Sequence, residues 1–141
     1  MINSEVQFWR VWVDEQGVSC QTRHSLKKHE KSAFTSGAGD IWNATHYKGP
    51  ATIITLILMP GELKDWHENP KPQWIIPLHG RWGVETMDGV IVEMGPGEMS
   101  FGGDQGTRNK QGHRSWAIGE APAVLLLIQV SEPPAWNPSI C

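Results

Sequence analysis

Glycine and proline are spaced so closely along this chain that they leave little room for long helices. The 141 residues include 15 glycines and 10 prolines, so a residue that interrupts helices recurs at about every sixth position. Between these breaks lie short segments rich in β-branched and aromatic residues, which are typical of strands. We therefore expect an all-β protein with under about a tenth of its residues in helix.

The expected strands follow one another at short intervals. They are residues 6–13, 41–47, 52–59, 73–78, 81–86, 90–94, 98–101, 113–118 and 123–130. Turns with glycine or proline separate most of them, and Asp88-Gly89 supplies the positive φ angles that a tight hairpin needs. Residues 23–31 are basic and polar, and we expect a short helix or a solvated loop there. This pattern predicts an antiparallel sandwich or barrel, and a small barrel encloses a cavity wide enough for one small ligand.

The length and charge of the chain limit its domain count and its partners. A chain of 141 residues suits one domain, and no repeat marks a second. We divide this domain into a core barrel of about residues 41–130, an N-terminal strand and loop of residues 1–40, and a tail of residues 131–141. The formal charge of -3 argues against nucleic acid or an anionic membrane as the main partner.

Cysteine content and hydropathy favour a cytoplasmic protein. Cys20 and Cys141 are too few for a disulfide framework, which indicates a reducing compartment. The N-terminal residues lack the basic start and apolar core of a signal peptide. The longest apolar run, residues 123–130, is far shorter than the ~20 residues that span a bilayer.

The segment 61–80 carries a recognisable spacing of polar residues. It begins and ends with glycine and holds His67, Asn69 and Gln73 in between. It resembles the first motif of the cupin family, which reads glycine, five residues, His-x-His, three or four residues, glutamate, six residues, glycine. All of these spacings hold here, with Asn69 in place of the second histidine and Gln73 in place of the glutamate.

A second stretch, residues 96–101 followed by a loop and His113, is similar to the second cupin motif. The resemblance covers about residues 51–130 and is to small, single-domain cupins of bacterial type. It implies an antiparallel double-stranded β-helix, the cupin jelly-roll barrel. It also implies that His113 joins the three polar residues of the first motif around the inner end of the cavity.

The resemblance implies one divalent metal ion, Fe, Mn, Ni or Zn, with His67, Gln73 and His113 as ligands. Side-chain amides are poor ligands for such ions, because Fe, Mn and Ni sites favour imidazole plus carboxylate. A site with a metal and a site without one therefore both stay open. The role of Asp104, which lies in the loop before His113, also stays open. The alternatives are a residue that hydrogen-bonds to a ligand of the site, a general acid and a solvated surface residue.

The histidines suit acid–base chemistry, and amides can orient a carbonyl or enolate oxygen. We therefore expect an enzyme that acts on a small apolar or aromatic substrate by proton transfer, as isomerases, cyclases, lyases and decarboxylases do. The alternatives are a metal-dependent dioxygenase, a non-catalytic ligand-binding barrel and a scaffolding protein. The candidate catalytic residues are His67, His113 and His46. The candidate substrate-binding residues are Trp66, Asn69, Trp74, Trp82 and Trp42.

The N-terminal strand bears on oligomeric state. Residues 6–13 place apolar side chains on both faces, including Trp9 and Trp12, which is more than a single contact can bury. Cupin barrels also commonly pair. We therefore expect a homodimer.

Overall fold

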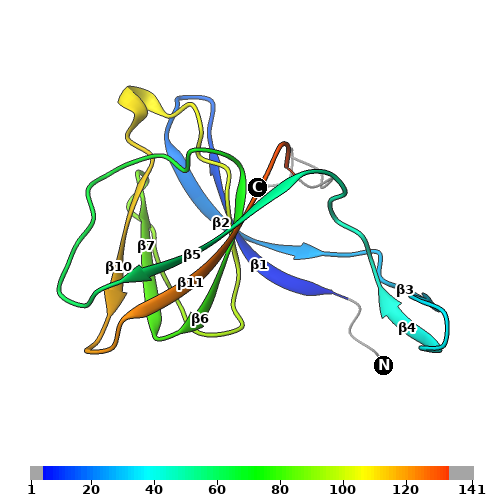
Figure 1. The fold of residues 1–141 in the computed structure, drawn as a ribbon. Coiled ribbons are helices and arrows are strands. Elements are labelled where there is room, and N and C mark those ends of the chain that lie inside the picture. The colour runs from blue at the N-terminus through cyan, green and yellow to red at the C-terminus, as the bar shows by residue number, and fades with distance from the viewer. Residues whose placement is uncertain (1–4, 134–141) are drawn as a thin grey trace.

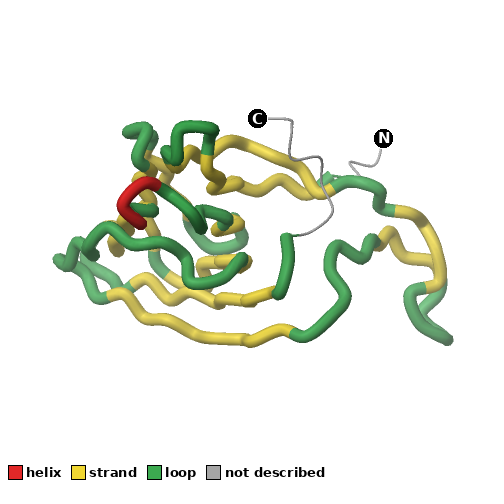
Figure 2. The backbone as a smooth tube through the Cα atoms, turned by 90° about the horizontal axis from the view of Figure 1, so that it is seen from above, coloured by secondary structure: helices red, strands yellow, loops and turns green. Residues whose placement is uncertain are grey.

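A computed structural model describes residues 5–133 of the chain, and most of its regular structure is β-strand (Figures 1 and 2). The strands are β1 (Val6–Val13), β2 (Ser19–Leu26), β3 (Glu30–Ala33), β4 (Asp40–Asn43), β5 (Ala51–Leu58), β6 (Gln73–His79), β7 (Arg81–Thr86), β8 (Ile91–Met94), β9 (Ser100–Gly102), β10 (His113–Ile118) and β11 (Ala123–Val130). Helix within this range is limited to one 3₁₀ turn, Arg108–Lys110. The expectation of a nearly all-β chain is confirmed. No helix among the described residues is long and apolar enough to cross a lipid bilayer.

The strands form two main sheets and one separate ribbon. The large sheet has the order β2-β1-β9-β6-β11-β5, the small sheet has the order β10-β7-β8, and β3 pairs with β4. All neighbours are antiparallel except β1 and β9, where Trp9 pairs with Ser100 in parallel. The expectation of a purely antiparallel arrangement is therefore wrong at this pair. Most of the chain lies between β1 and β9, and such a long connection permits the crossover that a parallel pair requires.

The prediction for residues 23–31 is also wrong, because most of this segment is strand. β2 pairs with β1 along its whole length, from Val6 opposite Leu26 to Val13 opposite Ser19. β2 lies at the edge of the large sheet, where polar side chains are tolerated. Its buried Gln21 donates to two backbone carbonyls, those of Val84 and Val90. Pairing with β1 therefore outweighs the low strand propensity of these residues.

The main core lies between the two sheets, and strands of both contribute to it. Its buried residues are Leu58, Ile75, Trp82, Val84, Val92, Met94, Ala117, Ala123, Leu125 and Leu127. Side chains alternate along a strand, so the inward residues of β11 leave Val124, Leu126 and Ile128 on the outer face. A second cluster, Phe8, Trp74, Phe101 and Val130, packs on the other side of β6.

A β-ribbon projects from the sheets. We call residues 27–48, which include β3 and β4, the arm; it extends to one side of the molecule in both ribbon views (Figures 1 and 2). β3 and β4 pair with each other and with neither main sheet. Residues 34–39 form the turn between them.

Candidate functional site

A cavity of about 430 Å³ lies between the sheets. Its apolar walls are Leu56, Leu58, Ile75, Trp82, Leu125 and Leu127. Its polar lining is Lys64, Asp65, His67, Asn69, Gln73, His113 and Ser115. Asp65 and His67 are exposed whereas His113 and Gln73 are buried, so the cavity opens to solvent beside His67 and is closed at His113. A mostly apolar pocket with a few convergent polar groups is the usual form of a small-molecule site.

Backbone pairing brings His67 and His113 together. His67 lies in the segment of residues 59–72 between β5 and β6, and His113 begins β10. The His67 N–H donates to the His113 carbonyl at 2.8 Å, and the His113 N–H donates back at 2.9 Å. The ring centroids lie 4.7 Å apart. Gly112 makes this approach possible, because its φ is +67° and a Cβ there would overlap the His67 carbonyl.

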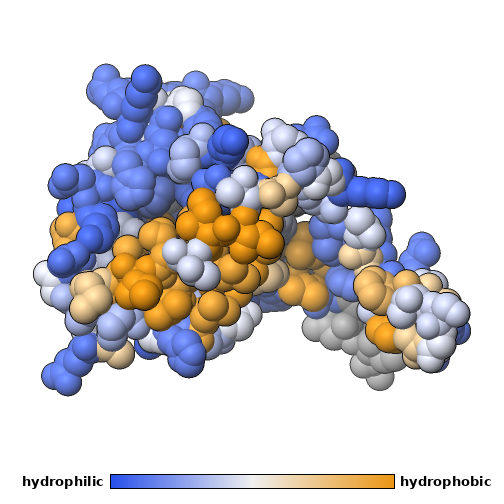
Figure 3. All heavy atoms as spheres, viewed as in Figure 1, coloured by the Kyte–Doolittle hydropathy of each residue, from blue (hydrophilic) through white to orange (hydrophobic). Residues whose placement is uncertain are grey.

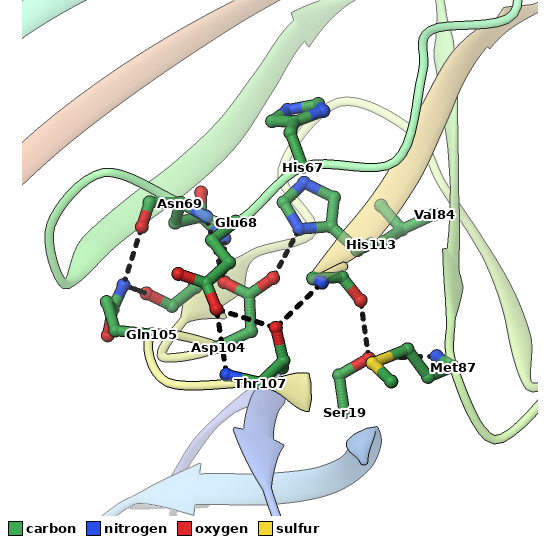
Figure 4. A network of polar contacts seen from close by, with 12 residues as sticks. Ser19, His67, Glu68, Asn69, Val84, Met87, Asp104, Gln105, Thr107 and His113 are labelled. Carbon is green, nitrogen blue, oxygen red and sulfur yellow. Dashed lines mark hydrogen bonds and ion pairs between the residues drawn. The ribbon is translucent and has the colours of Figure 1, made fainter. Parts of the chain in front are cut away.

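Asp104 holds His113 from behind the cavity (Figure 4). Its side chain is fully buried, and its Oδ2 lies 2.6 Å from the His113 Nδ1. Its Oδ1 accepts from the Asn69 backbone N–H at 3.1 Å and from the Asn69 amide at 2.7 Å. Burial alone would raise the pKa of Asp104, but the hydrogen bond and charge of His113 and the bonds from Asn69 outweigh it, so the pKa is lowered.

The ionised Asp104 fixes which nitrogen of His113 carries the proton. A carboxylate only accepts, so the His113 Nδ1 must donate to it. In the neutral ring the Nε2 is then a bare acceptor, and this nitrogen points toward His67 (Figure 4). A buried carboxylate behind an imidazole also stabilises the cation that forms when the Nε2 takes a proton.

The same carboxylate orients a chain of three amides. Asn69 must turn its NH₂ to Asp104, which leaves its Oδ1 to accept from the Gln73 Nε2. The Gln73 Oε1 in turn accepts from the Gln129 Nε2 at 3.0 Å. We call the series Gln129, Gln73, Asn69, Asp104 and His113 the polar relay. Every member has a partner, which keeps these buried groups in one arrangement.

His67 is oriented by its own segment. Its Nδ1 lies 2.7 Å from the Asp65 carbonyl oxygen. A carbonyl only accepts, so the Nδ1 carries the proton and the neutral ring presents an unprotonated Nε2. The two histidines therefore have the same tautomer, each held by a different acceptor.

The loop that carries Asp104 is tied to the residue after His67. The Glu68 Oε2 accepts from the Gly106 N–H at 3.1 Å and from the N–H and Oγ1 of Thr107 at 2.7 and 2.6 Å. The Thr107 Oγ1 accepts from the Gly112 N–H at 2.9 Å. Glu68 thus faces away from the cavity, as the alternation of an extended chain predicts, and anchors the loop under His113.

The donor set does not fit the divalent metal that the cupin resemblance implies. The side-chain oxygens of Asn69 and Gln73 are engaged as acceptors in the polar relay. Residues 5–133 contain no group of three or more His, Cys, Asp and Glu side chains placed to hold an ion. His67 and His113 alone supply fewer ligands than a protein metal site normally needs. We therefore derive no chemical step through a metal.

The other predicted site residues have different positions. Trp82 lines the cavity, as expected, but Trp66 and Trp74 do not. Trp66 lies 5.0 Å from the Arg114 guanidinium, and Trp74 packs against Phe8 and Phe101. Each of these two tryptophans is the chain neighbour of a cavity residue, so in an extended backbone it points the opposite way. Of the four candidate substrate-binding tryptophans, Trp82 is the one in the described lining of the cavity.

Trp42 and His46 belong to the arm and not to the cavity lining. Trp42 is exposed on β4. The His46 ring packs against the ring of His29 at 5.6 Å, and burial and the charge of His29 lower its pKa. The structure therefore gives no support to His46 as a catalytic residue, because the arm projects away from the two main sheets and the cavity between them.

Two polar residues of the site, one in the cavity lining and one behind it, were not predicted from the sequence. Ser115 lies two residues after His113 on β10 and so shares its face. Gln129 is the one polar residue in the apolar run 123–130. A polar side chain in such a strand indicates a hydrogen-bond partner inside the protein. In the structure that partner is Gln73, which stands opposite it in the register of β11 and β6.

No family model matches the chain, and no curated protein matches it in sequence. Among solved structures, the chain is similar to the crystal structure of protein NMB1881 from Neisseria meningitidis. The two share 20% sequence identity, the match covers 60% of this chain and 78% of that chain, and the TM-score is 0.47.

Proposed function

We propose that this chain is a small-molecule enzyme of cupin type that catalyses proton transfer on an apolar or aromatic substrate, with His113 as the general base. The observation that carries the proposal is the 2.6 Å contact between the His113 Nδ1 and the fully buried Asp104. It leaves the Nε2 free to take a proton beside a largely apolar cavity. The two facing sheets with the cavity between them support a double-stranded β-helix as the fold.

The chemistry that this geometry supports is a proton shift within one substrate. The His113 Nε2 removes a proton from a carbon next to a carbonyl, and Asp104 stabilises the resulting imidazolium. The same nitrogen then returns the proton to a different atom of the substrate, so no oxidant or reductant is needed. His67 is exposed beside His113 and can pass the proton to and from water.

Hydrogen exchange can test the proposal without knowledge of the natural substrate. Enolisable aromatic ketones with short alkyl chains are incubated with the protein in deuterium oxide, and loss of the proton adjacent to the carbonyl is followed by proton NMR. We expect the wild-type protein to accelerate this exchange and His113→Ala to lose at least ~100-fold of the acceleration. His79→Ala is the matched control, since His79 is exposed at the far end of β6 from Gln73. Binding of a ketone without exchange would instead indicate a non-catalytic barrel.

We also propose that the protein is a homodimer in which the arm of each copy packs on the partner's large sheet. Phe34, Ile41 and Trp42 on the arm are 70%, 46% and 42% exposed. On β5, an edge strand, Ile53 and Ile57 are 71% and 63% exposed. The space-filling view shows an apolar area where β5 and β11 lie (Figure 3). Apolar surface of this kind, on both the arm and the sheet, favours burial against another chain.

Charge supports a second copy as the occupant of this surface. The arm contains four lysines, at positions 27, 28, 31 and 48, against Glu30 and Asp40. The chain as a whole carries -3, so the remainder is acidic. An arm of positive charge is attracted to the acidic body of another copy, and complementary charges guide such association. A two-stranded ribbon is also marginally stable by itself, and docking would stabilise it.

A further inference from the structure

We infer that the cavity selects an uncharged apolar ligand that donates a hydroxyl hydrogen, such as a phenol or an enol. This inference rests on the proposed function, because it names the substrate class of the same site. It follows from the direction of the hydrogen bonds that the two histidines and the amides make around the cavity, and not from the cavity's size.

The two histidines offer acceptors to a ligand. The His113 Nδ1 is committed to Asp104 and the His67 Nδ1 to the Asp65 carbonyl. Each neutral ring therefore presents only its Nε2 lone pair to a further partner. A ligand hydroxyl can donate a hydrogen bond to such a nitrogen. A carboxylate or an ether oxygen has no hydrogen to donate, so its lone pairs are repelled by the lone pair of the nitrogen.

The amides of the polar side are directed toward one another and toward Asp104. Asn69 donates one N–H of its amide to Asp104, and Gln73 donates one N–H of its amide to Asn69. Their carbonyl oxygens are also engaged, within the polar relay. Ser115 adds one hydroxyl to the lining, and a hydroxyl both donates and accepts.

The charges near the cavity disfavour an anion. Lys64, the cation among the described lining residues, forms an ion pair with Glu62. Asp65 is also among the lining residues, and Asp104 lies ionised behind His113. A carboxylate ligand would lose its hydration here without gaining an unpaired positive partner, and such desolvation is costly.

The walls account for the apolar part of the ligand. Leucine and isoleucine side chains from β5, β6 and β11 face Trp82 from β7 across the cavity. Trp82 gives a flat face on which an aromatic ring can pack. Removal of a proton next to a carbonyl gives an enolate, and transfer of that proton from the imidazolium to the enolate oxygen gives an enol, so the preference suits the proposed chemistry.

Three matched probes test the inference: para-propylphenol, para-propylanisole and para-propylbenzoate. They share one apolar body and differ in presenting a hydroxyl donor, a methylated oxygen or a carboxylate. Binding to the wild-type protein is measured by titration calorimetry at about pH 8, where ordinary histidine is neutral. We expect the phenol to bind at least ~10-fold more tightly than the anisole and more tightly than the benzoate.

His113→Ala and His67→Ala should each reduce the preference for phenol over anisole, whereas His79→Ala should leave it unchanged. The comparison of the probes on the wild-type protein does not depend on whether any variant folds. Tightest binding of the benzoate, or equal binding of phenol and anisole, would overturn the inference. Phenol binding without deuterium exchange on the ketones would overturn the proposed catalysis and leave the ligand class standing. Deuterium exchange on the ketones, with the benzoate as the tightest ligand, would overturn the ligand class and leave the proposed catalysis standing.

Discussion

Gln129 and Gln73 face each other across β11 and β6, and the Gln129 amide donates to the Gln73 side-chain oxygen at 3.0 Å. This contact is the far end of the polar relay, whose other end is His113. It places a polar residue in a strand whose other side chains are apolar. The orientation of the His113 imidazole is thus connected to a residue on β11 of the large sheet.

Replacement of Gln129 by leucine should destabilise the protein by about 1–3 kcal/mol, because the buried Gln73 oxygen loses its donor. Urea unfolding of the variant and the wild type measures the difference. Gln16→Leu is the control, since Gln16 is exposed and surface changes of this kind usually stay within about 0.5 kcal/mol. Equal stability of Gln129→Leu and the wild type would show that the contact contributes nothing.

Asp104→Asn should reduce the rate of deuterium exchange by at least ~100-fold while the shape of the site is kept. An amide can turn its NH₂ toward His113, and the ring then carries its proton on the wrong nitrogen. The measurement is the exchange assay together with binding of para-propylphenol. Loss of exchange with retained folding, seen in the near-UV spectrum, is the expected pattern. An unchanged rate would exclude His113 held by Asp104 as the base.

Acid should weaken the fold through Asp104. Its pKa in the folded protein is lowered from an ordinary value of 3.8. As the pH falls, the unfolded chain therefore takes up this proton first, and stability is lost progressively below about pH 4 while it is complete above about pH 5. Urea midpoints of the wild type and Asp104→Asn should converge as the pH is lowered through this window. A difference between the two urea midpoints that stays constant with pH would contradict the lowered pKa of Asp104.

Gly112→Ala should cost about 2–4 kcal/mol and disturb the pairing of the two histidines. The added Cβ would overlap the His67 carbonyl at a residue with a φ of +67°. Gly119→Ala isolates the backbone contribution, because Gly119 has a φ of +85° and nothing within 4 Å of its Cβ position. Thermal unfolding of both variants should show the larger loss at Gly112. Equal losses would mean that the close approach to His67 is unimportant.

Light scattering should give twice the chain mass of 15.7 kDa if the arm of one copy packs on the large sheet of another. The double change Phe34→Ser and Trp42→Ser removes exposed apolar side chains of the arm and should yield monomers. Val90→Ser is the control, because Val90 is exposed outside the arm and outside β5. A wild-type monomer at micromolar concentration would refute this arrangement. A dimer that survives the double change would place the interface elsewhere.

The sequence was most informative where turns punctuate apolar strands. Residues 81–86, 113–118 and 123–130 form strands with the expected bounds, because glycine or proline lies near their ends and apolar side chains alternate or run together between them. β2 was not predicted, because its stability comes from pairing with β1 and no local sequence pattern indicates that contact. For the same reason the parallel pair of β1 and β9 could not be read from neighbouring residues.

The candidate site was predictable in its spacing and not in its hydrogen bonds. His67, Gln73 and His113 could be named because motif spacing places them around one cavity. The role of Asp104 depends on the path of a loop that brings it 35 residues back to Asn69, which sequence alone does not define. Trp66 and Trp74 were misplaced because each stands beside a cavity residue, and a shift of one position in an extended chain changes the face.

The segment of residues 59–72 lies outside both sheets, although it supplies His67 and Asn69 to the cavity. Three backbone bridges to β10 hold it: Pro60 with Ala117, Leu63 with Trp116 and His67 with His113. Substitutions between the bridges therefore change the opening of the cavity without breaking the hydrogen bonds of either sheet. A randomised library restricted to residues 64–66, with proline excluded at position 64 so that its N–H still donates to the Ser115 carbonyl, is a rational route to new ligand preferences.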